Sequence, residues 1–247
     1  MTFFDKIDSA RIPQETEENY ILNAFLIVRY KTEFPVEVVA WKLYEKVQKE
    51  YLTPVATPLC QLPVIVRKTD PNLANALLYN IVKNDDSRIQ IGVGDGFVCL
   101  NFAAFSYKQW KEFKETFLRI LPAVGTDFTK NMFSIKYVNA FKRDIISDLE
   151  VSLKIKDKEA QQESAPFNIL FQEVDETYVC PINIFREAEF TYTNNEKKVE
   201  KGKGSVIDIE VQTVKMSDNN EDEILERLHK KAEDIFFGIY PSLQRKI

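Results

Sequence analysis

Histidine is nearly absent from this chain of 247 residues, which contains one, His229. Catalytic triads, cysteine-histidine pairs and histidine-rich metal sites all need an imidazole, so each of them would have to use this residue. The sequence therefore argues against most histidine-based chemistry. Because we recognise no catalytic, cofactor-binding or metal-binding motif in the chain, we expect a non-enzymatic protein without a cofactor.

Cysteine is also scarce, with Cys60, Cys99 and Cys180 as the three examples. They are too few and too widely spaced for a disulfide framework or for a zinc site built from CxxC motifs. Cys99 and Cys180 each lie within a mainly apolar run, which is typical of a thiol that packs in a core. We interpret all three as buried thiols.

Long hydrophobic runs are missing as well. The apolar stretch near the N-terminus, residues 24–28, is far shorter than the ~20 residues that cross a bilayer. Residues 1–20 carry several acidic side chains and lack the basic start and apolar middle of a signal peptide. We therefore expect a cytoplasmic protein that does not bind membranes.

Positive charge is in deficit, with 33 lysines and arginines against 38 aspartates and glutamates and a formal net charge of -5. A protein that binds nucleic acid by bulk electrostatics needs a clustered basic excess, so this balance argues against that function. The chain is instead rich in large apolar side chains, with 18 Phe and 10 Tyr. These can build the core of a globular protein or an interface.

The spacing of apolar residues predicts strands and helices in the first half of the chain. Residues 20–32 are rich in β-branched and aromatic side chains and predict a strand, and three- and four-residue spacing over 36–52 predicts an amphipathic helix. A second helix is expected over 107–121. Between the two helices, short strands are expected over residues 62–68, 77–83, 88–93 and 97–102. The segment 77–83 would also suit a helix.

The glycine-rich segment 92–96 joins two alternating strands. A dinucleotide-binding loop lies between a strand and a helix, and a P-loop ends in a Gly-Lys-Ser/Thr sequence that this chain lacks. The segment therefore predicts a hairpin turn, and the strands expected over 77–102 form an antiparallel meander.

The second half repeats the order of elements. Its apolar pattern predicts a strand over 132–141, a helix over 144–153 and a charged linker over 156–164. An amphipathic helix that contains His229 closes the chain. Before that helix, strands are expected over residues 168–174, 177–185, 186–193 and 205–216.

In both halves the predicted order of elements is thus a strand, a helix, several strands and a second helix. A helix with one apolar stripe and a sheet with one apolar face bury both surfaces when the helix lies across the sheet. We predict an α+β fold of antiparallel sheets with helices packed across one face, pseudo-duplicated as in TATA-binding-protein-like or helix-grip folds. A polar tail over 1–19 precedes the halves, 20–125 and 126–247, which form two units or one continuous domain.

Two features are candidate contact sites. His229 lies at the edge of the apolar stripe of the last helix, with Glu226 and Glu233 about one turn away, which is more typical of a packing histidine or a surface ion pair than of a binding residue. A cluster of lysines occupies an expected hairpin tip, where it either prevents edge-to-edge strand pairing or contacts an acidic partner or a nucleic-acid backbone. These lysines are Lys197, Lys198, Lys201 and Lys203.

Four stretches of the chain carry a resemblance. They are Phe34-Pro35 at the start of the first helix; Arg88-Ile89-Gln90-Ile91-Gly92 followed by Tyr107, Trp110 and Phe113; Ile135-Lys136-Tyr137-Val138-Asn139; and Leu228-His229-Lys230-Lys231-Ala232 with Phe236. Together they resemble a sporadically distributed prokaryotic protein family with no established biochemical activity. The family more often has Arg-Tyr-Ile-Asn at positions 136–139. The resemblance spans residue 20 to the C-terminus and implies an accessory protein of bacteria or archaea, without catalytic residues.

Three functions follow from these features. The first is a non-catalytic binding or interaction protein of an accessory prokaryotic system, such as defence or toxin control, with a protein partner or a second copy of itself. The second is a carrier of a small apolar ligand, held between helices and a curved sheet. The third is a nucleic-acid-associated protein that uses the lysine-rich hairpin. An enzyme that uses carboxylates and a metal ranks last.

Overall fold

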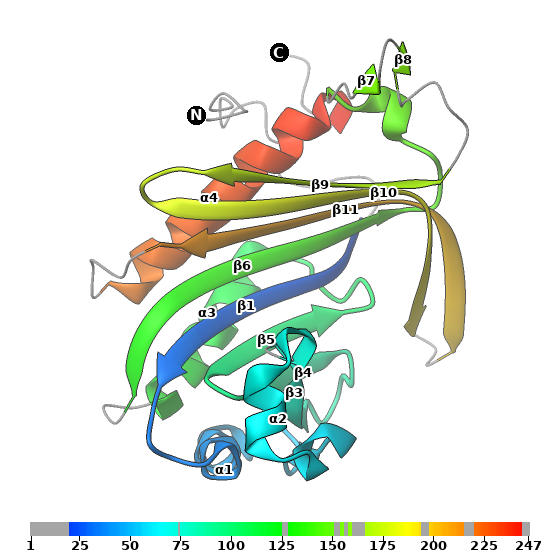
Figure 1. The fold of residues 1–247 in the computed structure, drawn as a ribbon. Coiled ribbons are helices and arrows are strands. Elements are labelled where there is room, and N and C mark those ends of the chain that lie inside the picture. The colour runs from blue at the N-terminus through cyan, green and yellow to red at the C-terminus, as the bar shows by residue number, and fades with distance from the viewer. Residues whose placement is uncertain are drawn as a thin grey trace.

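The protein folds around one antiparallel β-sheet of nine strands with helices packed on it (Figure 1). The predicted α+β class and the antiparallel pairing are therefore confirmed. The expected tail over 1–19 and Lys197 lie outside the residues that the structure describes. That structure, a computed structural model, describes residues 20–73, 75–124, 128–150, 154–155, 158–159, 166–193, 198–214 and 220–243.

Helices separate groups of strands along the chain. The first half contains β1 (Ile21–Lys31), α1 (Val36–Val47), β2 (Val55–Ala56), α2 (Val64–Thr69), β3 (Leu77–Val82), β4 (Ile89–Gly94), β5 (Phe97–Ala103) and α3 (Trp110–Ile120). The second half contains β6 (Thr129–Phe141), β7 (Lys154–Ile155), β8 (Lys158–Glu159), β9 (Phe167–Val174), β10 (Tyr178–Thr193), β11 (Val199–Thr213) and α4 (Glu221–Ile239). The short strands β7 and β8 pair with each other outside the main sheet.

The sheet runs continuously through both halves of the chain, in the order β2-β3-β4-β5-β1-β6-β11-β10-β9. The first strand of each half lies in the middle, where β1 and β6 pair with Leu26 opposite Ile135. In each half the first strand also pairs with the last strand of the same half, β5 or β11. The sheet therefore ends in β2 on one side and in β9 on the other.

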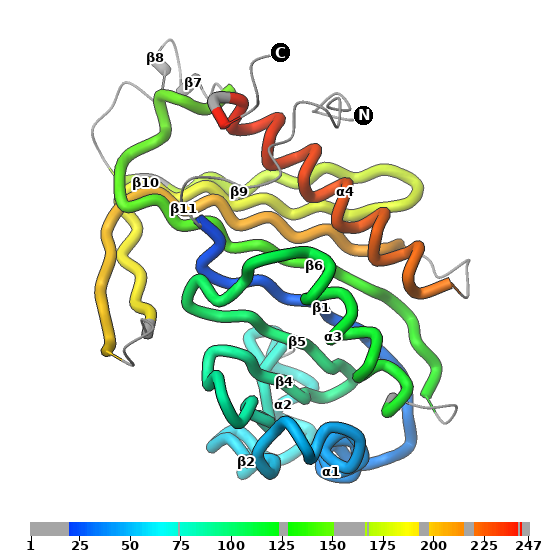
Figure 2. The backbone as a smooth tube through the Cα atoms, turned by 180° about the vertical axis from the view of Figure 1, so that it is seen from behind, coloured from blue at the N-terminus to red at the C-terminus, as the bar shows by residue number. Residues whose placement is uncertain are grey.

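The helices α1, α3 and α4 cover one face of this sheet (Figure 2). Along β1 the side chains of Ala24, Leu26 and Val28 point to the helices and are fully buried, while those between them are half-buried. This alternation follows from the two-residue period of a strand. The apolar stripe of α4, with Leu225 and Leu228, packs into the same core. Within the described residues, no helix combines the length and apolar content that spanning a bilayer requires.

The opposite face of the sheet is covered unevenly. In the first half, α2 and the turns beside it lie against this face (Figure 1). The buried Arg67 fixes this cover, because its Nε donates to Asp95 in the β4–β5 turn at 2.8 Å and its Nη1 donates to the Leu62 carbonyl at 2.7 Å. That turn is the predicted hairpin, and Gly96 takes the positive φ of 82° that favours glycine there.

In the second half, the outer parts of β10 and β11 bend away from the sheet plane (Figure 1) and form a hairpin arm, residues 188–193 and 199–204. A bulge between Phe185 and Ala188 marks the bend, and Glu187 within it has a φ of 57°. Phe190 and Tyr192 of the arm pack near Leu22 at one end of the sheet. The predicted strands over 177–185 and 186–193 are therefore one bent strand.

The strand predicted over residues 62–68 is wrong, because this segment forms α2. Pro63 precedes the helix with a φ of -55°, and its carbonyl accepts the N–H of Arg67 at 3.2 Å. The apolar residues that favoured a buried strand, Val64 and Ile65, stay at the surface. The helical turn instead directs Arg67 inward, where its guanidinium pairs with Asp95.

The helix predicted over residues 144–153 is also wrong in its described part, residues 144–150, which contains a 3₁₀ turn, Ile146–Asp148. Asp144 Oδ1 accepts the N–H of Ile146 at 3.0 Å, and Oδ2 accepts from Arg186 at 2.8 Å. A side chain that binds nearby backbone donors competes with helix formation. The described part of the second half thus has no counterpart of α1, so it does not repeat the predicted order of a strand followed directly by a helix.

Candidate functional site

His229 lies half-buried among aromatic rings where α3, α4 and β6 meet. Its ring stacks on Trp110 with 4.2 Å between centroids, and its Nδ1 is 3.0 Å from the Tyr137 hydroxyl. Its Nε2 is 3.3 Å from a carboxylate oxygen of Glu233, whereas Glu226 pairs with a lysine of α3. Both ring nitrogens therefore have partners within the fold, which agrees with a packing role.

Two buried phenols lie beside this histidine. The hydroxyls of Tyr107 and Tyr137 are 3.4 Å apart. Burial is the main cause that raises the pKa of each phenol above its ordinary value, and the nearby Glu233 carboxylate adds to it. Both phenols stay neutral at physiological pH and act as hydrogen-bonding groups rather than as bases.

Acidic residues interrupt the predicted lysine cluster. Lys201 and Lys203 are exposed on the hairpin arm, and Lys198 is exposed just before it. Lys203 Nζ lies 3.0 Å from a carboxylate oxygen of Glu187, and the residue opposite Lys203 on β10 is another glutamate. With Lys197 outside the described residues, the described part of the arm carries mixed charge and is not a uniformly basic surface.

The cysteines and acidic residues show no metal site: in the described ranges, no three His, Cys, Asp or Glu side chains group as a metal ion requires. Cys99 and Cys180 are buried, and burial raises the pKa of each thiol to about 12. A thiol that stays protonated is a poor nucleophile. Cys60 is only half-buried, contrary to prediction, and its Sγ donates to the Leu78 carbonyl at 2.8 Å.

The strand β9 forms a long edge of the sheet. It pairs with β10 along its whole length, and no described strand lies on its other side. Phe171 packs against the core, while Leu170 and Val174 point to the opposite face and are 66% and 52% exposed. Exposed apolar side chains therefore lie along an edge on which no described strand pairs with the outer side of β9.

The one charged side chain of β9 points inward. Glu173 is fully buried, and its carboxylate lies 2.5 Å from Lys231 Nζ on α4. Burial lowers the pKa of the Lys231 ammonium, but the hydrogen bond and the charge of Glu173 outweigh that effect, so the net direction is upward. Edge strands commonly carry lysine, proline, a bulge or an inward-pointing charge, which prevents pairing with other chains. Glu173 is an inward-pointing charge, and Lys231 pairs with it inside the fold. β9 has no lysine, proline or bulge.

The opposite edge of the sheet is protected. Its edge strand β2 has two residues, and Pro54 and Pro58 flank it. A short strand between prolines offers few main-chain groups to another chain. Of the two edges, β9 is the one that is open to further pairing.

Sequence reasoning predicted residues 168–174 as a strand but did not identify it as an edge. Strand order depends on pairings between distant segments, such as β6 with β11, that a local apolar pattern does not reveal. One available signal was the lack of lysine and proline in this strand. That signal has a meaning only when the strand is known to lie at an edge.

Comparisons of the chain with protein-family models, with curated proteins and with solved structures found no match. The resemblance to a prokaryotic family therefore stays a prediction. The functional inference rests on the residues of the chain itself.

Proposed function

We propose that this protein is a non-catalytic interaction protein whose partner is a second copy of the same chain, paired through β9. The observation that carries the proposal is an eight-residue edge strand with no outward charge. An antiparallel strand presents N–H and C=O groups in a pattern that is complementary to itself under a twofold rotation. Two copies would then share one sheet.

Side chains beside the edge add to this main-chain pairing. Leu170 and Val174 are exposed in one copy, and burying such a side chain contributes about 1.5–3 kcal/mol. The inward position of Glu173 avoids like charges across the twofold axis. Because a single pair of strands buries less than the ~1,600 Å² of a standard interface, we expect a dissociation constant of roughly 1–100 μM.

Other observations make the two alternative functions weaker proposals. The pocket between α3 and the sheet is lined mostly by charged and polar side chains, which do not suit a carrier's apolar ligand. Glutamates alternate with the lysines of the hairpin arm, which weakens its attraction for nucleic acid. The role in an accessory prokaryotic system rests on the family resemblance alone and stays part of the proposal.

Sedimentation velocity over roughly 1–100 μM tests the proposed pairing. Leu170→Lys places like charges beside the edge in both copies and should weaken association at least about tenfold, at unchanged circular dichroism. Val55→Lys is the matched control, because Val55 is an exposed apolar residue on the other edge strand. A wild-type chain that stays monomeric throughout, or equal effects of both substitutions, would contradict the proposal.

A further inference from the structure

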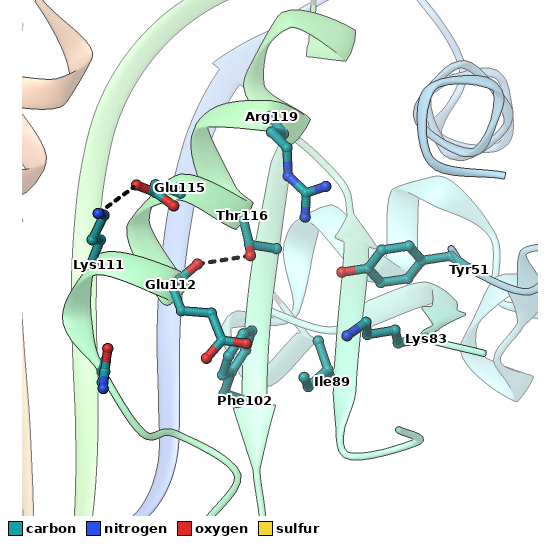
Figure 3. A pocket seen from close by; sticks show the side chains of 10 residues that line it. Tyr51, Lys83, Ile89, Phe102, Lys111, Glu112, Glu115, Thr116 and Arg119 are labelled. Carbon is teal, nitrogen blue, oxygen red and sulfur yellow. Dashed lines mark hydrogen bonds and ion pairs between the residues drawn. The ribbon is translucent and has the colours of Figure 1, made fainter. Parts of the chain in front are cut away.

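A polar cavity of about 540 Å³ lies between α3 and the strands β3 and β4, in the half of the sheet away from β9 (Figure 3). Apolar side chains, Ile89 and Phe102, form part of its wall. Charged and polar groups form most of the rest. Among them are Tyr51, Lys83, Arg119, Glu112 and Thr116.

The backbone brings Tyr51 and Lys83 to the same wall. The two residues face each other in an antiparallel bridge, and the N–H of Leu52 donates to the Val82 carbonyl at 2.8 Å. Opposed residues of an antiparallel pair project to the same side. The phenol and the ammonium therefore both reach the cavity, and Arg119 enters it from the last turn of α3 (Figure 3).

The hydroxyl of Tyr51 is a buried donor with no acceptor among the described residues. Tyr51 is 3% exposed, and its Oη is buried with no hydrogen-bond partner among the described residues. Burial raises the pKa of Tyr51 to about 12, an effect that the nearby Arg119 opposes. The phenol thus keeps its proton at neutral pH. Native proteins rarely leave such a group unsatisfied, so its position in a cavity points to an acceptor on a ligand.

The two cations beside Tyr51 are held by exchangeable surface pairs. Lys83 Nζ lies 3.4 Å from the exposed Asp85 carboxylate, and Arg119 Nη1 lies 2.8 Å from the Glu50 carboxylate. Exposed pairs of this kind contribute little, so the cations can turn to a ligand at small cost. Across the cavity lie Glu112 and the pair Lys111–Glu115, whose charged atoms are 3.9 Å apart (Figure 3).

We infer that this cavity binds a small organic anion whose carboxylate or phosphate accepts a hydrogen bond from Tyr51 between Lys83 and Arg119. A hydrogen-bond donor on the same molecule, such as an amine, faces Glu112. The volume of about 540 Å³ is within the usual range for small-molecule sites and exceeds what an inorganic ion needs. This site is independent of β9 pairing, and its charged lining selects a polar ligand rather than the apolar one that the sequence suggested.

Calorimetric titration tests the inference with two probes that each carry an anion and an amine. Phosphoethanolamine supplies a phosphate and 4-aminobutyrate a carboxylate, so the two titrations distinguish the two anions. At least one should bind with a dissociation constant of about 1 mM or tighter. Tyr51→Phe should weaken binding about tenfold, since it removes a hydrogen bond to a charged group, and Tyr44→Phe should leave it unchanged. No binding of either probe would overturn the inference.

Thermal unfolding without a probe gives a second readout of Tyr51. If its hydroxyl is unsatisfied, Tyr51→Phe should raise Tm by about 2 °C. A structural hydroxyl with an unseen partner would give the opposite sign. A Tyr51→Phe variant with a lower Tm and unchanged probe affinity would therefore overturn the inference.

Discussion

The two halves of the sheet are covered in different ways. In the first half, α1 and α3 lie on one face, α2 and its turns lie on the other, and a two-residue strand closes the edge. In the second half, α4 covers one face of the sheet, and the hairpin arm covers one end of the opposite face. The strand β9 forms the edge of the sheet there. The first half also contains the polar cavity between α3 and the sheet. The open edge of the second half produces a surface suited to another chain.

The largest effect is expected where one buried pair holds the second half together. Lys231→Met removes the ammonium that pairs with the buried Glu173 carboxylate and should lower the free energy of unfolding by about 3–5 kcal/mol. Urea unfolding measures the change. In the double variant Lys231→Met/Glu173→Leu, apolar packing replaces the pair, and most of the stability should return. A loss below about 1 kcal/mol in the single variant would show that this pair does not anchor β9.

The cover of the first half depends on Arg67 and Asp95. Asp95→Asn removes the carboxylate from a buried guanidinium and should cost about 2 kcal/mol in urea unfolding. Because Arg67 also contacts the carbonyl of Cys60, this thiol should react faster with a labelling reagent. Asp85→Asn, in an exposed pair, is the control and should cost less than about 0.5 kcal/mol. Equal labelling rates in both variants would refute the anchoring role.

Alkaline pH should weaken the half that contains the cavity. An unfolded tyrosine ionises near pH 10, whereas burial raises the pKa of Tyr51 to about 12. The stability contribution is fully present below about pH 10, and as pH rises to about 12 it is lost, because the unfolded chain releases a proton that the folded chain keeps.

Tyr51 adds at most about 1.4 kcal/mol per pH unit to the slope of the free energy of unfolding against pH. Tyr51→Phe should remove that part of the slope in urea unfolding at several alkaline pH values, and Tyr44→Phe should not. Identical slopes in wild type and Tyr51→Phe would mean that this phenol is not buried as described.

The smallest effect is expected at His229, where both halves meet. His229→Gln removes the ring that stacks on Trp110 and alters the hydrogen bond with the Tyr137 hydroxyl. It should lower the free energy of unfolding by about 1 kcal/mol. Dimer formation and probe binding should be unchanged in this variant. Loss of either one in a folded His229→Gln protein would assign this residue a functional role that its contacts do not indicate.

Local patterns predicted the elements whose burial follows their own periodicity. The alternation of β1 and the stripe of α4 are features of single segments. β1 formed close to its expected bounds, and α4 formed as the expected helix that contains His229. Residues 62–68 and the described part of 144–153, residues 144–150, were predicted wrongly because side-chain contacts favour other conformations. Arg67 reaches Asp95, and Asp144 binds the backbone beside it. Sequence spacing does not reveal the first of these contacts.

The candidate sites were harder to predict than the strands. Tyr51 lies within the helix predicted over 36–52, but α1 ends at Val47 and Tyr51 instead forms a bridge with Lys83. This bridge joins segments that are distant in the chain. The apolar residues of β9 likewise indicate a pairing surface only because β9 is an edge strand, with the eight other strands of the sheet on one side of it. Both sites depend on the strand order, which local periodicity does not determine.

Hydrogen exchange of the β9 amides at two protein concentrations tests the central claim most directly. If β9 pairs with a second copy, its amides should exchange more slowly at about 100 μM than at about 1 μM, while the amides of β2 stay the same. In Leu170→Lys, β9 should exchange at the faster rate at both concentrations. Equal exchange of β9 in the wild-type protein at both concentrations would contradict pairing through this edge.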